Sequence, residues 1–301
     1  MPTNLDAYTA RESIELVGRA GVVKANMRLD KAFFSSVTAG MILSFACATL
    51  LSTNSSQWYQ ENAAGLIRTL AALVFPYGLT IIVLTGMDLC TGSFMFTTVS
   101  VLQRRLSPLR MLIHWIVTFF GNLAGSLFVV AIITGYGGVF DQQFFHTEAI
   151  NFAVAKQNTP SWHQIFLRAI GANWLVCLAC YLGMSGRDYA SKVLGIWWPT
   201  FAFVSLGFDH VVANMFFVPT GIWQGAPISV GTYIYKGIIP GLIGNVIGGG
   251  FFPDVAIDGM YYGQEIHGVE ARGLRVKRGI RDEESQRAVQ ADDAKSGEQS
   301  S

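Results

Sequence analysis

Three ionisable side chains interrupt long apolar stretches of this sequence. Asp88 follows Gly86 in one stretch, and Asp209 and His210 follow Gly207 in another, so that two apolar stretches contain the same pattern, Gly-x-Asp. A carboxylate within a membrane is costly and is tolerated mainly where it lines a cavity or meets a partner. Histidine changes charge near neutral pH. The pattern predicts a transport path where the two interrupted segments meet, with His210 as the titratable group of its central zone. The alternative is a histidine that is hydrogen-bonded inside a helix bundle.

The composition places these interruptions in a membrane protein. Of the 301 residues, 51% are hydrophobic and 14% are charged, and the mean hydropathy is +0.39. Six stretches supply the ~20 residues that a transmembrane helix needs. They are 32–51, 65–85, 111–135, 162–183, 193–224 and 232–252. The sequence therefore predicts an all-α membrane protein with six transmembrane helices, of which the second and fifth are broken.

The distribution of lysine and arginine predicts the orientation. Basic residues lie before the first span, after the second and after the fourth, whereas the opposite loops, at 52–64, 136–161 and 225–231, contain only Lys156. The basic segments hold Arg11, Arg19, Lys24, Arg28 and Lys31; Arg104, Arg105 and Arg110; and Arg187 and Lys192. By the positive-inside rule both termini are cytoplasmic, and the plasma membrane is the expected location. The net charge of +1 gives no reason to expect a nucleic-acid partner.

Two motifs recur at nearly the same spacing. Gly207 follows Gly86 by 121 residues, and the run beginning Gly244-Asn245 follows Gly121-Asn122 by 123 residues. Each half then contains three spans, and because three is odd, the second half starts on the opposite side of the membrane. The sequence therefore predicts two inverted three-helix repeats.

The residues after each Gly-x-Asp pattern predict half-helices that start near mid-membrane. Leu89 to Ser93 are mostly small or hydroxylated and suit a bend, after which we expect the helix to resume at Phe94. A second half-helix is expected to start within 210–214. Free N–H groups and the positive ends of two helix dipoles would then face the centre, which favours an anion there.

The chain divides into three parts. Residues 1–31 mix apolar and charged residues and are expected to form a cytoplasmic amphipathic helix at the membrane surface. Residues 32–253 form the predicted six-helix channel domain. Residues 254–301 are polar and charge-dense and are expected to be a largely disordered cytoplasmic tail.

Other chemistries receive less support from the residues. Cys177-x-x-Cys180 lies in an apolar run and is best explained as packing, so we expect no metal and no cofactor. His114, with no matching interruption, is interpreted as structural or interfacial. An intramembrane aspartyl protease, with Asp88 and Asp209 as its carboxylate pair, is a distant alternative. Such a pair must face one site, whereas inverted repeats would place the two aspartates on opposite sides of a central plane. A receptor or scaffold would leave the paired interruptions unexplained.

Four motifs resemble the formate/nitrite transporter family, whose members are pentameric anion channels with an aquaporin-like six-helix protomer. GFDHVVANM at 207–215 resembles the broken fifth helix, and AIGANWLVCLA at 169–179 is similar to the fourth. GMDLCTG at 86–92 resembles the second-helix loop, and GNVIGGG at 244–250 the sixth helix. The resemblance implies a homopentamer in the lipid bilayer, transporting a small anion and a proton.

The resemblance also implies roles for individual residues. His210 would contact or protonate the anion, with Thr91 across the pore and Asn214 lining its centre. A trio, Lys156, Asn173 and Asp209, would attract the anion, with the asparagine linking the lysine to the carboxylate. The implied apolar constrictions are Phe75, Leu79, Leu89 and Phe203, and the implied gating-loop residues are Asp88, Cys90 and Gly92.

Departures from the family pattern bear on the substrate. Met87 and Cys90 alter the second-helix signature, and Asp209 stands where bacterial members often have glutamate. The long polar tail resembles fungal nitrite transporters. Nitrite is therefore the expected substrate, with formate or another short carboxylate as the alternative.

Overall fold

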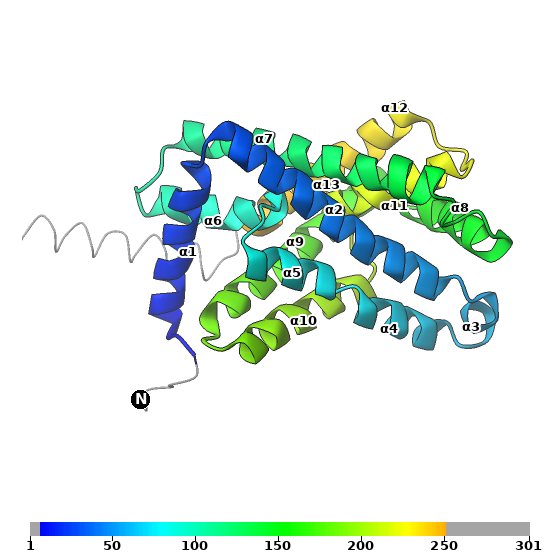
Figure 1. The fold of residues 1–301 in the computed structure, drawn as a ribbon, viewed down its shortest axis with the longest axis horizontal. Coiled ribbons are helices and arrows are strands. Elements are labelled where there is room, and N and C mark those ends of the chain that lie inside the picture. Colours follow the sequence, from blue (N-terminus) through cyan, green and yellow to red (C-terminus); the bar gives the residue numbers. More distant parts are fainter. Residues whose placement is uncertain (1–6, 251–301) are drawn as a thin grey trace, which may run out of the picture.

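The computed structural model describes residues 7–250, which form helices joined by short connections and no β-strand (Figure 1). This confirms the predicted all-α class for that part of the chain. The helices are α1 (Ala10–Ala25), α2 (Leu29–Asn54), α3 (Gln57–Asn62), α4 (Ala64–Val74), α5 (Tyr77–Thr85), α6 (Cys90–Leu102), α7 (Pro108–Phe128), η1 (Val129–Tyr136), α8 (Gln143–Gln157), α9 (Trp162–Ser185), α10 (Tyr189–Ser205), α11 (Val211–Trp223), α12 (Val230–Thr232), η2 (Tyr233–Ile238) and α13 (Ile239–Gly250). The predicted tail, 254–301, lies outside the described residues.

Four continuous helical segments are long and apolar enough to cross a membrane. They are α2, α4 with α5, α7 with η1, and α9. α6 and α11 are also apolar but have only 13 residues each, or about 20 Å of helix, which is less than a hydrocarbon core of about 30 Å. Each of these short helices follows one of the predicted breaks.

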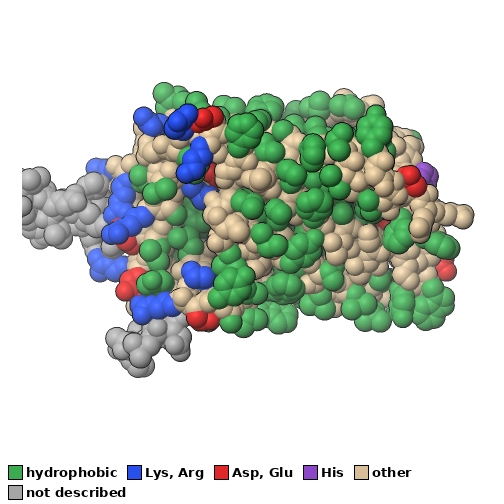
Figure 2. All heavy atoms as spheres, in the orientation of Figure 1, with side chains coloured by type: hydrophobic (Ala, Val, Ile, Leu, Met, Phe, Trp, Pro, Cys, Tyr) green, Lys and Arg blue, Asp and Glu red, His purple; other side chains and the backbone are tan. Residues whose placement is uncertain are grey.

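The surface separates apolar from basic side chains. Apolar side chains cover the middle of the molecule, and lysine and arginine gather at the end where α1 lies (Figure 2). We call this the basic end. Large side chains such as Phe120 and Trp198 are 55% and 60% exposed, which is the surface that lipid would cover. The protein is therefore a multi-pass membrane protein.

The two helix breaks depend on glycine. Gly86 ends α5 with φ 76°, and Gly207 follows α10 with φ 70°, both in the left-handed region that glycine enters without strain. α6 then begins at Cys90, four residues before Phe94, where the sequence predicts that the helix resumes. The first turn of α6 therefore contains Cys90, Thr91 and Gly92.

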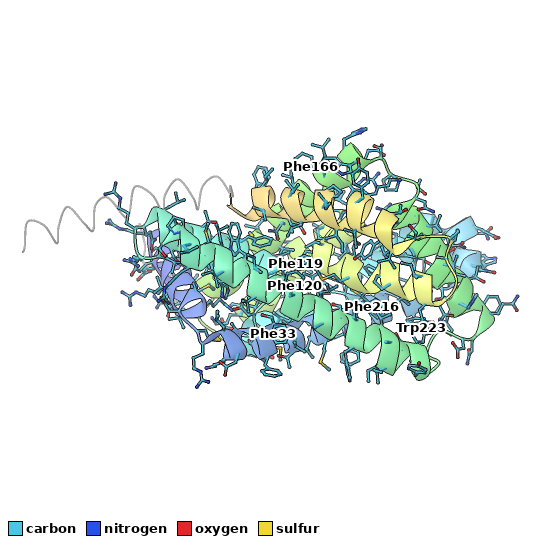
Figure 3. The ribbon with its side chains drawn as sticks, turned by 90° about the horizontal axis from the view of Figure 1, so that it is seen from above. Phe33, Phe119, Phe120, Phe166, Phe216 and Trp223 are labelled. Carbon is cyan, nitrogen blue, oxygen red and sulfur yellow. The ribbon has the colours of Figure 1, made fainter. Side chains whose placement is uncertain are left out.

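Small residues bring the long helices into close contact. α2 packs against α7, and α9 packs against α13. A side chain at Gly125 would collide with the Val37 carbonyl on α2, and one at Gly248 would collide with the Ile170 carbonyl on α9. Both glycines belong to the recurring Gly-Asn motifs, so the two motifs serve equivalent helix contacts. α7 also lies beside α11, as Phe120 and Phe216 show in Figure 3.

The N-terminal helix and α8 complete the bundle. α1 starts at a capping box formed by Thr9 and Glu12, and it packs against α6, where Ser100 Oγ donates a 2.7 Å hydrogen bond to the Gly18 carbonyl. α8 lies within 136–161, for which the sequence predicts a loop, and it packs against α11. Both helices therefore contact a half-helix directly.

Candidate functional site

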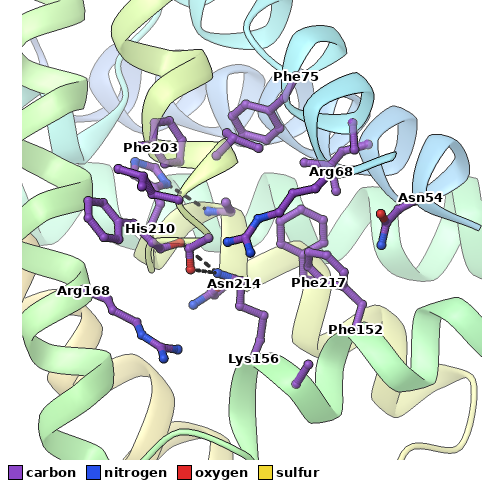
Figure 4. A pocket seen from close by; sticks show the side chains of 18 of the residues that line it. Asn54, Arg68, Phe75, Phe152, Lys156, Arg168, Phe203, His210, Asn214 and Phe217 are labelled. Carbon is purple, nitrogen blue, oxygen red and sulfur yellow. Dashed lines mark hydrogen bonds between the residues drawn. The ribbon is translucent and has the colours of Figure 1, made fainter. Parts of the chain in front are cut away.

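A cavity of about 610 Å³ lies beside α3, α4 and α8, at the end away from α1 in Figure 1, and Figure 4 shows it from close by. Its walls come from α2, α3, α4, α8, α9, α10 and α11. Three basic side chains, Arg68, Lys156 and Arg168, line it together with Asn214, and Phe75, Phe203 and His210 close its inner part. The cavity thus leads from a basic mouth to the second helix break.

His210 lies directly before α11 and caps it. Its Nδ1 accepts a 3.1 Å hydrogen bond from the Ala213 N–H, and its Nε2 lies 2.9 Å from Thr91 Oγ1 on α6. Because Nδ1 is occupied as an acceptor, the neutral ring carries its proton on Nε2, and this N–H donates to the threonine. The hydrogen bond joins the two half-helices, so the structure brings His210 and Thr91 together.

Lys156 is held on the loop before His210. Its Nζ donates to the carbonyls of Gly207 at 2.9 Å and Phe208 at 2.8 Å, and it lies 3.2 Å from Asp209 Oδ1. Asn214 Nδ2 donates to the same carboxylate oxygen at 3.2 Å. Asp209 is completely buried, so the lysine supplies the charge that a buried carboxylate requires.

Asn173 occupies a different position from the one implied by the resemblance. Its Nδ2 donates to the carbonyls of Thr91 at 3.1 Å and Asn245 at 2.6 Å. The contact between Lys156 and Asp209 is direct and does not run through Asn173. The reason is the close packing of α9 on α13, where Gly249 leaves room for the Asn173 amide. Asn173 therefore fixes the backbone of α6 beside the Thr91 hydroxyl.

Two of the four predicted constriction residues line the cavity. The rings of Phe75 and Phe203 are nearly perpendicular, with centroids 5.7 Å apart, and the Phe203 ring lies 5.9 Å from His210. Leu79 and Leu89 are buried in the same apolar core but do not line this cavity. An anion entering from the cavity would meet the phenylalanines before it meets the histidine.

Two asparagines hold the helix breaks with matching hydrogen bonds. Asn122 Oδ1 accepts from the Cys90 N–H, and its Nδ2 donates to the carbonyls of Asp88 and Ser36. Asn245 makes the same three bonds with Val211, Asp209 and Ala169. The sequence shows both asparagines as a repeated motif, and the structure gives the reason for the repetition.

The first break has a charged cluster that no sequence motif reveals. Lys24 Nζ lies 3.4 Å from Asp88 Oδ1 and donates to the Met87 carbonyl at 3.3 Å, which is the role of Lys156 at the second break. His114 Nε2 lies 3.2 Å from Asp88 Oδ2, and Ser93 Oγ donates to Oδ1. Each aspartate thus has its own lysine, which is unlike two protease carboxylates sharing one proton.

A family model described as formate/nitrite transporter matches residues 11–257. The chain belongs to the formate/nitrite transporter family. A protein of Bacillus subtilis (strain 168) named "Uncharacterized transporter YrhG" is 41% identical over 241 residues, which are 80% of this chain and 89% of that protein. "Formate channel BtFdhC" of Bacillus thuringiensis is 32% identical over 250 residues, covering 83% and 94%.

A solved channel structure is similar in fold to this protein. A structure titled "Pentameric formate channel with formate bound" has a TM-score of 0.66 and 28% identity, and the match covers 74% of this chain and 94% of that chain. The family and these relatives are transporters and channels, so this protein is a transporter or channel and not an enzyme. These relatives do not single out fungal nitrite transporters.

A buried carboxyl group, that of Glu148, binds two side chains that line the cavity, and these contacts depend on pH. Glu148 on α8 is 6% exposed and accepts hydrogen bonds from the side-chain amides of Asn54 and Gln60, both of which line the cavity. Burial raises the pKa of the Glu148 carboxyl, and the two amide hydrogen bonds offset this only in part. Folding therefore favours the protonated form more than the unfolded chain does.

Acidification is expected to stabilise the fold through Glu148. Since the folded-state pKa is raised, this contribution grows as the pH falls through it and is lost as the pH rises. Glu148→Gln is expected to flatten the rise in apparent Tm that the purified protein shows as the pH is lowered from neutral. Glu61→Gln, at an exposed side chain nearby, is the control and should keep the slope. An unchanged slope in Glu148→Gln would exclude Glu148 as the titrating group.

Proposed function

We propose that the protein carries a small monovalent anion across the plasma membrane, nitrite first and formate as the alternative. The observation that carries this proposal is the His210–Thr91 hydrogen bond, which joins the two helix breaks below a basic cavity. Membership of the formate/nitrite transporter family supports a small anion as substrate. The relative named a formate channel supports formate as strongly as nitrite.

The proposed architecture has six transmembrane helices in two inverted repeats, with the second and fifth helices broken. The equivalent hydrogen bonds of Asn122 and Asn245 support it, as do the paired contacts of Lys24 with Asp88 and of Lys156 with Asp209. With the basic end in the cytoplasm, the cavity is the outer vestibule. A homopentamer with one pore in each protomer is proposed from the likeness to a channel titled pentameric.

The proposed path begins at Lys156 and ends beyond His210. The basic mouth attracts the anion. The apolar constriction formed by the rings of Phe75 and Phe203, which we call the slit, then penalises the charge of the anion. At His210 the passing species replaces Thr91 as the partner of the Nε2 proton. The neutral acid formed there then crosses the rest of the apolar path at lower cost than the anion would.

Proton coupling is proposed to use the α11 cap. When Nδ1 releases the Ala213 N–H and takes a proton, the ring becomes an imidazolium. Transfer of the Nε2 proton to an anion oxygen then gives the neutral acid and a neutral imidazole. The proton that Nδ1 takes comes from the vestibule water, so the ring ends the transfer at its starting charge and one proton moves with each anion. Loss of the Nδ1 proton to water and uptake of one proton at Nε2 then restore the tautomer that accepts from the Ala213 N–H.

Uptake into proteoliposomes tests this function. Vesicles containing the purified protein are expected to take up labelled nitrite and formate faster than empty vesicles do, and an inward proton gradient should increase the rate. Comparison of the two anions at equal concentration decides which is preferred. Cleavage of a reporter peptide is the control for a protease. Uptake equal to that of empty vesicles for both anions would overturn the proposal.

A further inference from the structure

Two arginines line the cavity without a protein partner. Arg68 comes from α4 and Arg168 from α9, and neither has a hydrogen bond or ion pair within residues 7–250. Lys156, in contrast, is paired with Asp209. None of the described residues that line the cavity is an aspartate or glutamate. The cavity therefore holds two positive charges that no residue within 7–250 neutralises.

Arg68 lies at the same loop as Lys156. A Cβ atom on Gly207 would collide with Nη2 of Arg68, while the Gly207 carbonyl accepts a hydrogen bond from Lys156 Nζ. Both cations therefore meet at the residue that starts the second break. Figure 4 shows Arg68 and Arg168 entering the cavity from opposite sides of Lys156 and Asn214. The guanidinium groups thus stand before the slit that leads to His210.

The fold does not require either arginine. The 121-residue spacing of the two breaks makes Tyr189 the counterpart of Arg68. The carbonyls of Ser36 and Ala169 accept equivalent bonds from Asn122 and Asn245, so these two residues correspond in the repeats. The residues directly before them, Ser35 and Arg168, therefore correspond as well. Neither counterpart is charged. Arginines at the outer end also run against the usual excess of basic residues on the cytoplasmic side, so they need another explanation.

The geometry points to a ligand with two oxygen atoms. We propose that Arg68 and Arg168 form an anion-docking site in the outer vestibule that prefers small planar oxyanions, carboxylates or nitrite, and this rests on the proposed anion transport. A guanidinium presents two parallel N–H donors that match two oxygens on one centre, whereas an ammonium acts as a point charge. The docking site loads the anion before it reaches the slit.

Substitutions that separate charge from shape test the docking site. Arg68→Gln and Arg168→Gln are each expected to raise the half-saturation concentration for formate uptake from the vestibule side about tenfold, with the maximal rate nearly unchanged. Arg68→Lys and Arg168→Lys keep the charge and should recover only part of the loss. Lys236→Gln is the matched control, because Lys236 is half-buried, donates to the Asn158 carbonyl and does not line the cavity.

Binding measured without transport separates this proposal from the proposed function. Formate line broadening in ¹H NMR, on the solubilised protein after gel filtration, should be strong for the wild type and the Lys236→Gln variant and weak for both glutamine variants. Wild-type broadening without uptake would reject transport and keep the docking site. Glutamine variants that broaden formate as the wild type does would overturn the site, and lysine variants equal to the wild type would overturn the preference for two oxygens.

Discussion

Replacement of His210 by phenylalanine is expected to reduce proton-coupled anion uptake by at least about 100-fold, the usual minimum for a lost acid–base group. The Phe203 ring already lies 5.9 Å from His210, so a second aromatic ring fits this apolar surrounding. The variant loses both the Nε2 donor and the Nδ1 acceptor that caps α11. Uptake of labelled nitrite and formate into proteoliposomes under an inward proton gradient measures the effect.

A second variant separates the chemistry of His210 from its capping role. Asparagine is among the best N-cap residues, so His210→Asn keeps an acceptor for the α11 N–H groups but has no group that titrates near neutral pH. It should keep the thermal stability of the wild type and still fail to couple uptake to protons. His163→Phe, at an exposed histidine, is the control and should transport normally. Unchanged uptake by His210→Phe would exclude the histidine step.

The breaks can be predicted from the sequence because their signals are local. A glycine followed by an aspartate in an apolar run marks an interrupted helix, and the structure has a positive φ at both Gly86 and Gly207. The predicted start of α6 is wrong because Thr91 and Gly92 are poor helix formers in isolation. The Asn122 side chain satisfies the Cys90 N–H there, and this tertiary contact has no local signal.

The partners of the charged residues are harder to predict. Lys24 resembles the other basic residues near it in sequence because Asp88 is 64 residues away, and its role emerges only when α1 is seen against α6. His114 has no visible partner in sequence for the same reason. Arg68 and Arg168 lie inside predicted spans, where an orientation argument based on loops does not count them.

The differences between the two breaks locate the chemistry better than their similarity. Both have a buried aspartate, a lysine and a bracketing asparagine. At the residue that caps each half-helix, the first break has Leu89 and the second has His210. Groups shared by the breaks therefore hold the fold, and groups found at only one of them, such as His210, are the candidates for transport.

The asparagine brackets are expected to be indispensable for folding. Asn245→Leu keeps the branched shape of the side chain but leaves the Val211 N–H and the carbonyls of Ala169 and Asp209 without their partner. Each buried unpaired group costs about 1–3 kcal/mol, and no water is available at mid-membrane to replace the asparagine. The sum is a large share of a typical total stability of about 5–15 kcal/mol.

Asn245→Leu should therefore give little monodisperse protein in gel filtration and a much lower apparent Tm. Asn122→Leu removes the same three bonds at the first break and should be equally damaging. Asn245→Asp keeps the Oδ1 acceptor for Val211 and should fall between the two extremes, whereas Asn151→Leu, at an exposed position on α8, should be neutral. An Asn245→Leu protein that melts within about 2 °C of the wild type would show that these bonds do not hold the break.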